Sequence, residues 1–111
     1  MAIVVDGKTL GTDEEGYLLD PADWSEEIAR ELALRENVVL TDRHWAVIRF
    51  MREYYEQRLI AADSRHVMKF LREEGGAAEG RNELFRLFPY GYVKQACKIA
   101  GMRKPRAWST G

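Results

Sequence analysis

Apolar side chains recur every three or four positions along most of this chain, which is the spacing of one face of an α-helix. Near the N-terminus, two short β-prone runs replace this spacing. The helical pattern predicts helices over about residues 24–36, 42–58, 65–75, 82–88 and 91–100. We therefore expect a mainly α-helical fold, a small orthogonal bundle of about five helices with an N-terminal β-hairpin.

Local signals indicate where these helices begin and end. Asp23 is the expected N-cap of the first helix, with Glu26 three residues later as its capping-box partner. Thr41 and Ser64 are the expected N-caps of the second and third helices. Gly101 is well placed to end the last helix in a left-handed conformation.

The predicted hairpin turns at Asp6-Gly7, a pair that lies between two short apolar runs. Residues 17–19 are a candidate third strand. We expect a single domain over residues 1–111, made of a hairpin region (1–19), a helical bundle (20–101) and a flexible C-terminal arm (102–111).

Composition narrows the chemistry that such a fold supports. The chain has 111 residues, enough for one domain that buries its own core. Its single cysteine, Cys97, excludes an internal disulfide and a multi-cysteine zinc site. No apolar run reaches the ~20 residues that span a bilayer, and no secretory signal pattern opens the chain. We therefore expect a cytoplasmic monomer without metal, cofactor or membrane contact.

The net charge of −1 conceals a gradient along the chain. Residues 1–36 carry ten acids and three bases, whereas residues 84–111 carry six bases and no acid. A basic end suits an anionic partner, but it could equally fold back on the acidic first segment. The sequence leaves both interpretations open.

Cys97 has the side chain with the greatest chemical reactivity. Lys94 and Lys98 are its neighbours in the sequence and would lower the pKa of its thiol. Free cysteine is also among the most often buried residues, and the local sequence favours this second interpretation. His44 and His66 lack a metal-ligand pattern and are expected to be structural or solvated.

The other candidates are basic or aromatic. Arg65, Lys69 and Arg72 share one side of the third helix and could form the basic face of a DNA-binding helix-turn-helix. The loop that follows, residues 75–80, is longer than the usual turn of that motif. Trp108 lies in the basic arm, away from any helical stripe, where it could dock into a groove of this protein or of a partner.

Several segments spread over nearly the whole chain form a further pattern. They are residues 13–18 (DEEGYL), His44-Trp45, Arg49-Phe50, residues 52–55 (REYY), Arg65 with Lys69, residues 87–89 (LFP), residues 91–101 (GYVKQACKIAG) and Lys104-Pro105. Together they resemble the DsrC/TusE family of sulfur-relay proteins, and the run at residues 91–101 is the most specific of them.

The resemblance implies a small helical protein with an N-terminal hairpin, whose C-terminal arm carries sulfur as a cysteine persulfide. It implies one of two partners. A TusBCD-type complex would supply sulfur for tRNA wobble-uridine thiolation, and dissimilatory sulfite reductase would use the protein as a co-substrate. The carrier cysteine of the family is penultimate on the arm, and full-length DsrC proteins have a second cysteine upstream, on the last helix.

This chain departs from the family pattern at its C-terminal end. Cys97 matches the upstream cysteine, whereas Trp108 stands at the position of the penultimate one. Tyr92 and Arg103 stand where the family usually has proline. An indole cannot carry sulfane sulfur, so Cys97 is the candidate persulfide site.

Three functions are consistent with these residues. The first is a sulfur-relay protein, a sulfurtransferase-type carrier rather than a stand-alone enzyme, with Cys97 as the carrier. The second is a non-carrying regulatory or adaptor paralogue that keeps the docking surface, and the third is a DNA-binding protein. The residues expected to bind a partner or an anion are Arg65, Lys69, Lys94, Lys98, Arg103, Lys104 and Trp108.

Overall fold

The computed structural model describes residues 1–75 and 80–105. Its elements are β1 (Ala2–Val5), β2 (Lys8–Gly11), a 3₁₀ turn η1 (Pro21–Asp23), α1 (Glu26–Arg35), α2 (Asp42–Arg58), α3 (Ser64–Gly75), α4 (Gly80–Leu87), a π-helical turn η2 (Tyr92–Ala96) and α5 (Cys97–Ile99). The predicted class, mainly helical with an N-terminal hairpin, is confirmed. Arg106–Gly111, most of the predicted arm, lie outside the described residues.

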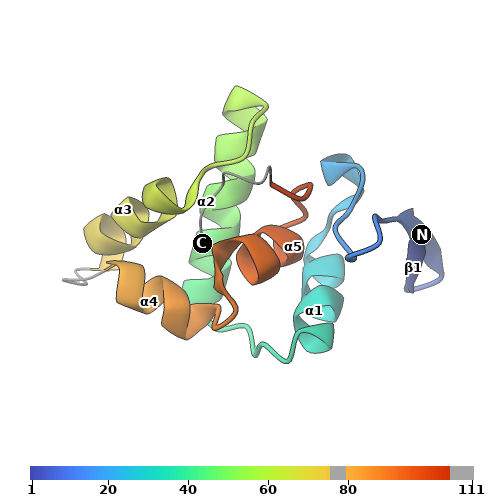
Figure 1. Cartoon of the computed structure of the whole chain (residues 1–111), viewed down its shortest axis with the longest axis horizontal. Coiled ribbons are helices and arrows are strands. Elements are labelled where there is room, and N and C mark those ends of the chain that lie inside the picture. The colour runs from blue at the N-terminus through green and yellow to red at the C-terminus, as the bar shows by residue number, and fades with distance from the viewer. Residues whose placement is uncertain (76–79, 106–111) are drawn as a thin grey trace.

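The helices are arranged around α2, the long helix in the middle of Figure 1. On one side of it α3 packs against both α2 and α4, and on the other side α1 packs against α5. The hairpin lies at the far end of the molecule, beyond α1. No helix in the described ranges is long and apolar enough to cross a membrane.

The hairpin has the turn that its sequence predicts. Asp6 and Gly7 have φ angles of 49° and 80°, the pair of positive values that a type I′ turn requires. This turn pairs Val5 with Lys8 and Ala2 with Gly11 in an antiparallel register. The predicted third strand is wrong, because the segment that follows contributes a single isolated bridge between Thr12 and Leu18.

Two of the predicted N-caps are also wrong. Trp24 has an extended backbone (ψ 146°), which separates η1 from α1 and makes Ser25 the N-cap of α1. Asp23 therefore belongs to η1, whose cap is Asp20. At α3 the Asp63 carboxylate accepts from the His66 backbone N–H (3.2 Å), and Ser64 is already the first helical residue.

The N-terminus of α2 is capped as predicted by Thr41, and the cap extends to a second helix. The Thr41 N–H donates to Nδ1 of His44 (3.0 Å), which completes a capping box. Nδ1 is thus an acceptor, and Nε2 carries the proton and donates to the Leu87 carbonyl at the end of α4 (2.7 Å). Burial lowers the pKa of His44, which keeps the ring neutral. The prediction of a structural histidine is confirmed here.

The hydrophobic core is one cluster to which each of the five α-helices contributes. Val47, Ile48 and Met51 of α2 are buried there together with Leu84 of α4 and Ile99 of α5. The core continues past the end of α5, because Met102 is buried as well. The prediction that an exposed arm begins at residue 102 is therefore wrong for its first residue.

Candidate functional site

Cys97 follows an unusual turn of helix. Gly91 enters the turn with a φ of 94°, and the N–H of Cys97 bonds to the carbonyl of Tyr92, five residues earlier. The predicted single helix over 91–100 is thus a π-helical turn followed by the short α5. Such π turns are frequent at functional sites, because they change the direction in which the next side chains point.

The thiol of Cys97 faces the core. Its residue is fully buried, and so is Tyr92, whose hydroxyl interacts with the thiol. Burial raises the pKa of Cys97 to about 12, and the nearby Tyr92 hydroxyl offsets this only in part. The thiol is therefore protonated at neutral pH, and the interpretation of Cys97 as a buried residue is confirmed. The expectation that the neighbouring lysines lower the pKa of this thiol is wrong.

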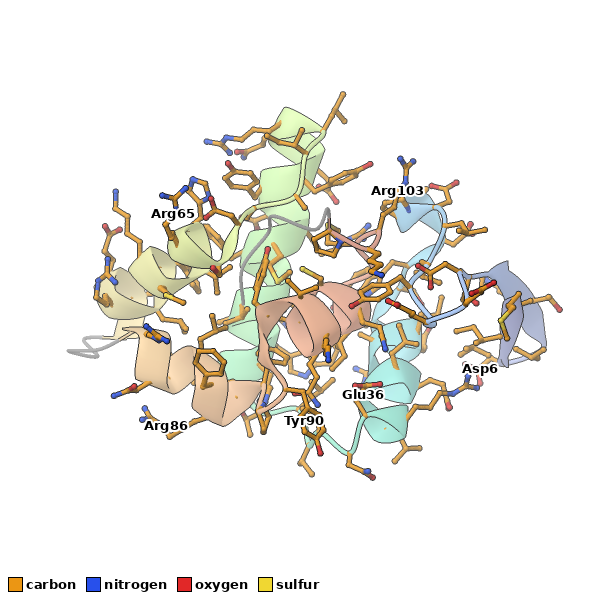
Figure 2. The ribbon with its side chains drawn as sticks, in the orientation of Figure 1. Asp6, Glu36, Arg65, Arg86, Tyr90 and Arg103 are labelled. Atoms are coloured by element: carbon orange, nitrogen blue, oxygen red, sulfur yellow. The ribbon has the colours of Figure 1, made fainter. Side chains whose placement is uncertain are left out.

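The two lysines that were expected to activate Cys97 point to another surface. Lys98 Nζ lies 3.5 Å from the Glu36 carboxylate and 5.0 Å from the centre of the Tyr17 ring. Lys94 is exposed, and both lysines line a surface pocket of about 440 Å³ that also contains Glu36 and Tyr90. Figure 2 shows Glu36 and Tyr90 at the same edge of the molecule. Sequence proximity failed as a guide because the segment formed by η2 and α5 turns the Cys97 sulfur inward and the two lysines outward.

The first residues of the basic C-terminal segment fold back on the acidic N-terminal part. Lys104 Nζ lies 2.9 Å from the Glu15 carboxylate, which raises the pKa of this lysine. Arg103 Nε donates to the Leu19 carbonyl (3.0 Å). Of the two interpretations of the charge gradient, internal neutralisation thus holds for Lys104, whereas Arg103 contacts the N-terminal part only through a backbone carbonyl. Trp108 lies outside the described residues.

The basic residues of α3 form a separate surface. Arg65, Lys69 and Arg72 are all exposed, but Arg65 lies 3.1 Å from Asp63 and Lys69 lies 3.9 Å from Glu73. Figure 2 shows Arg65 and Arg103 on either side of the C-terminal half of α2. The predicted partner-binding residues therefore do not gather into one patch, and the acidic neighbours weaken the DNA-binding hypothesis.

A groove over Tyr92 was not predicted from the sequence. Its volume is about 450 Å³, and its lining residues are Pro21, Tyr55, Leu59, Ile60, Ala61, Ala62, Asp63, Tyr92, Met102, Arg103, Lys104 and Pro105. Two adjacent large apolar residues at this groove, Leu59 and Ile60, are 76% and 61% exposed. The sequence signal for this site was Tyr92 itself, at a position where the family usually has proline.

Arg52 and Trp24 hold the segment that forms one wall of this groove. Arg52 donates to the carbonyls of Ala100 (3.2 Å) and Pro21 (3.0 Å), and its guanidinium lies 4.6 Å from the centre of the Trp24 ring. Trp24 in turn donates from Nε1 to the Ile99 carbonyl (2.9 Å). The end of α5 is thereby fixed to α2 and η1.

The described histidine and acidic side chains are not arranged as ligands of a metal ion. His66 lies 3.0 Å from Asp63 on the surface of α3, and His44 is engaged in the helix cap. Within residues 1–75 and 80–105 no three His, Cys, Asp or Glu side chains are grouped to hold a metal ion.

The raised pKa of Cys97 predicts a stability loss at alkaline pH. The unfolded thiol ionises above its ordinary pKa of 9.0, while the folded thiol keeps its proton until about pH 12. Stability is therefore complete below pH 9 and falls as the pH rises, by about 1 kcal/mol between pH 9 and 10. Urea unfolding at both pH values measures this loss. Cys97→Ala should reduce it and leave the smaller share of Tyr17 and Tyr92, whose pKa values burial also raises. An equal loss in both proteins would contradict the prediction.

Comparisons with known proteins agree over nearly the whole chain. The family described as "DsrC like protein" matches residues 4–107. Sulfurtransferase TusE of Photorhabdus laumondii is 43% identical over 104 residues, which cover 93% of this chain and 94% of that protein. Sulfurtransferase TusE of Sodalis glossinidius is 44% identical over 100 residues, covering 89% and 93%.

Solved structures give the same result. The oxidized gamma-subunit of dissimilatory sulfite reductase (DsrC) from Archaeoglobus fulgidus matches with a TM-score of 0.87 and 36% identity, over 96% of this chain and 98% of that chain. DsrC of Allochromatium vinosum matches with a TM-score of 0.83 and 44% identity, over the same shares. Sequence and fold agree from the hairpin to the turn that carries Cys97, and the chain belongs to the DsrC-like protein family.

Proposed function

We propose that this protein acts in sulfur relay as a docking partner of persulfide-handling machinery, and that Cys97 is not its resting sulfur carrier. Membership of the DsrC-like family, with relatives named sulfurtransferase TusE, supports a place in sulfur relay. Similarity to a protein described as the gamma-subunit of dissimilatory sulfite reductase supports that reductase as an alternative partner. The partner is thus a TusBCD-type complex or a dissimilatory sulfite reductase.

The complete burial of Cys97 is the observation that favours a docking role over a carrying role. A persulfide forms when a thiolate attacks the outer sulfur of a donor, so the attacking sulfur must be both ionised and reachable. Cys97 is neither, since it is fully buried and its pKa is raised to about 12. The position of the family's arm carrier holds Trp108, which offers no sulfur.

Incubation of the native protein with glutathione persulfide tests this proposal. We expect mass spectrometry to show no added sulfur atom on native protein, and one added sulfur on the same protein unfolded in urea. Cys97→Ala should take up none in either state, which assigns the site. Rapid, complete loading of native protein would overturn the docking-only role.

Binding provides the second half of the same experiment. The purified relay complex or sulfite reductase should bind wild-type protein and the Cys97→Ala variant with equal affinity, because the buried thiol takes no part in docking. Failure of both machineries to bind the protein would contradict the proposed partnership. A loss of binding confined to Cys97→Ala would instead favour a carrier that works through Cys97.

A further inference from the structure

Tyr92 separates Cys97 from the groove described above. The tyrosine lines the groove, and its hydroxyl interacts with the thiol of Cys97. Tyr92 is 1% exposed and Cys97 is 0% exposed, and Cys97 itself does not line the groove, so Tyr92 lies between the groove and the sulfur. The groove thus approaches the thiol and ends at this ring.

A hydrogen bond also holds the Tyr92 ring in place. Tyr92 donates its phenol proton to the carbonyl of Ala62. The hydroxyl lowers the pKa of the Cys97 thiol less than burial raises it, so the thiol stays neutral behind the ring.

Resting on the function proposed above, we propose that Tyr92 is the gate that keeps Cys97 inert, and that the groove is the route by which a small persulfide would reach it. Tyr92 is a positioning residue here, because it acts on Cys97 and not on a substrate. Its hydrogen-bond acceptor, Ala62, lies in the α2–α3 connection, and residues 59–63 of this connection also line the groove. An occupant of the groove therefore contacts both halves of the gate.

The chemistry behind an open gate needs no oxidant. The Cys97 thiol passes its proton to the departing donor thiolate, and the sulfur attacks the outer sulfur of the donor R–S–SH. One S–S bond forms at Cys97 as the S–S bond of the donor breaks, and the electron pair leaves with R–S⁻. Both sides of this exchange contain one persulfide and one thiol, so the redox state is unchanged.

Alkylation of Cys97 by iodoacetamide tests the gate, with Tyr92→Leu and Tyr92→Phe as variants. Tyr92→Leu opens the route, and we expect alkylation at least about tenfold faster than in the wild type, with a rate that changes little at low urea concentration. Tyr92→Phe keeps the ring but lacks the bond to Ala62. We expect about a tenfold increase from it, the factor that one lost hydrogen bond gives.

Phe88→Leu is the matched control, since Phe88 is a fully buried aromatic residue that packs against His44 and does not line the groove. Its alkylation should accelerate only through global unfolding, so its rate should rise steeply with urea. If Tyr92→Leu shows the same steep dependence, or if Tyr92→Phe is no faster than the wild type, the gate is refuted. Where Tyr92→Leu does not fold, the result for Tyr92→Phe decides.

A second substitution tests the route. Ala61 is exposed and lines the groove, so adding Ala61→Trp to Tyr92→Leu should slow alkylation again. Val39→Trp, at an exposed position outside the groove lining, should leave the fast rate unchanged. Equal rates in these two double variants would exclude the groove as the path. If native wild-type protein stays unloaded by glutathione persulfide while the Tyr92 variants are no faster, the gate fails and the docking function stands.

Discussion

Gly101→Ala is expected to destabilise the protein by about 3 kcal/mol or more. Gly101 has a φ of +77°, a conformation that costs an L-residue free energy wherever it occurs. A Cβ at this position would also lie 2.4 Å from Cδ1 and 2.7 Å from Cβ of Trp24. Trp24 cannot move aside without breaking its bond to the Ile99 carbonyl and its contact with Arg52. Backbone strain and overlap therefore add together.

Gly16→Ala is the matched control for this substitution. Gly16 has a similar φ of +93°, but a Cβ there would meet no atom within 4 Å. We expect it to cost about 1 kcal/mol, the part due to backbone conformation alone. Urea unfolding of the two variants separates the contributions. A Gly101→Ala protein no less stable than Gly16→Ala would show that α5 and Trp24 are not packed as described.

Arg52→Ala is the second large effect, with an expected loss of about 3 kcal/mol of unfolding free energy. The guanidinium satisfies the carbonyls of Ala100 and Pro21 and lies over the Trp24 ring. Removing it leaves both partly buried carbonyls without this donor and detaches the end of α5 from α2. Arg52→Lys should recover less than half of the loss, because a single ammonium cannot reproduce the two-sided geometry of the guanidinium.

Arg49 provides the comparison for Arg52 on the same helix. It is exposed, and its guanidinium lies 5.9 Å from the centre of the Trp45 ring. Arg49→Ala should cost only about 0.5 kcal/mol. Thermal and urea unfolding of Arg49→Ala, Arg52→Ala and Arg52→Lys measure the ranking. Similar losses for both alanine variants would mean that charge, rather than the two carbonyl bonds, gives Arg52 its effect.

The parts of the fold that depend on short-range signals could be predicted from the sequence. Asp6-Gly7 sets a two-residue turn, and Thr41 caps α2 through atoms only three residues away. Asp23 is not the cap of α1 because the extended backbone of Trp24 interrupts the helix after η1. The next helix, α1, therefore begins after Ser25. That conformation is set by the contacts of Trp24 with α5 and Arg52, far away in the sequence.

The sequence located the site at Cys97 but did not predict the contacts that surround it. The run around Cys97 identified the family, yet a 3.6-residue period cannot show a π turn, so Lys94 and Lys98 were wrongly expected to lower the pKa of the thiol. The Lys104–Glu15 pair joins residues 89 positions apart, which no local pattern indicates. Tyr92 was noted as a departure from the family, and its effect on Cys97 depends on the distant carbonyl of Ala62.

The close contact between α3 and α4 has a consequence for movement. A Cβ on Gly80 would lie 2.1 Å from the Met68 carbonyl oxygen, so the two helix backbones touch with no side chain between them. Backbones this close leave no room for the two helices to slide, so we expect α3 and α4 to move together. Ala62 lies directly before α3. A displacement of the α3–α4 pair would therefore also displace the acceptor of the hydrogen bond that Tyr92 donates.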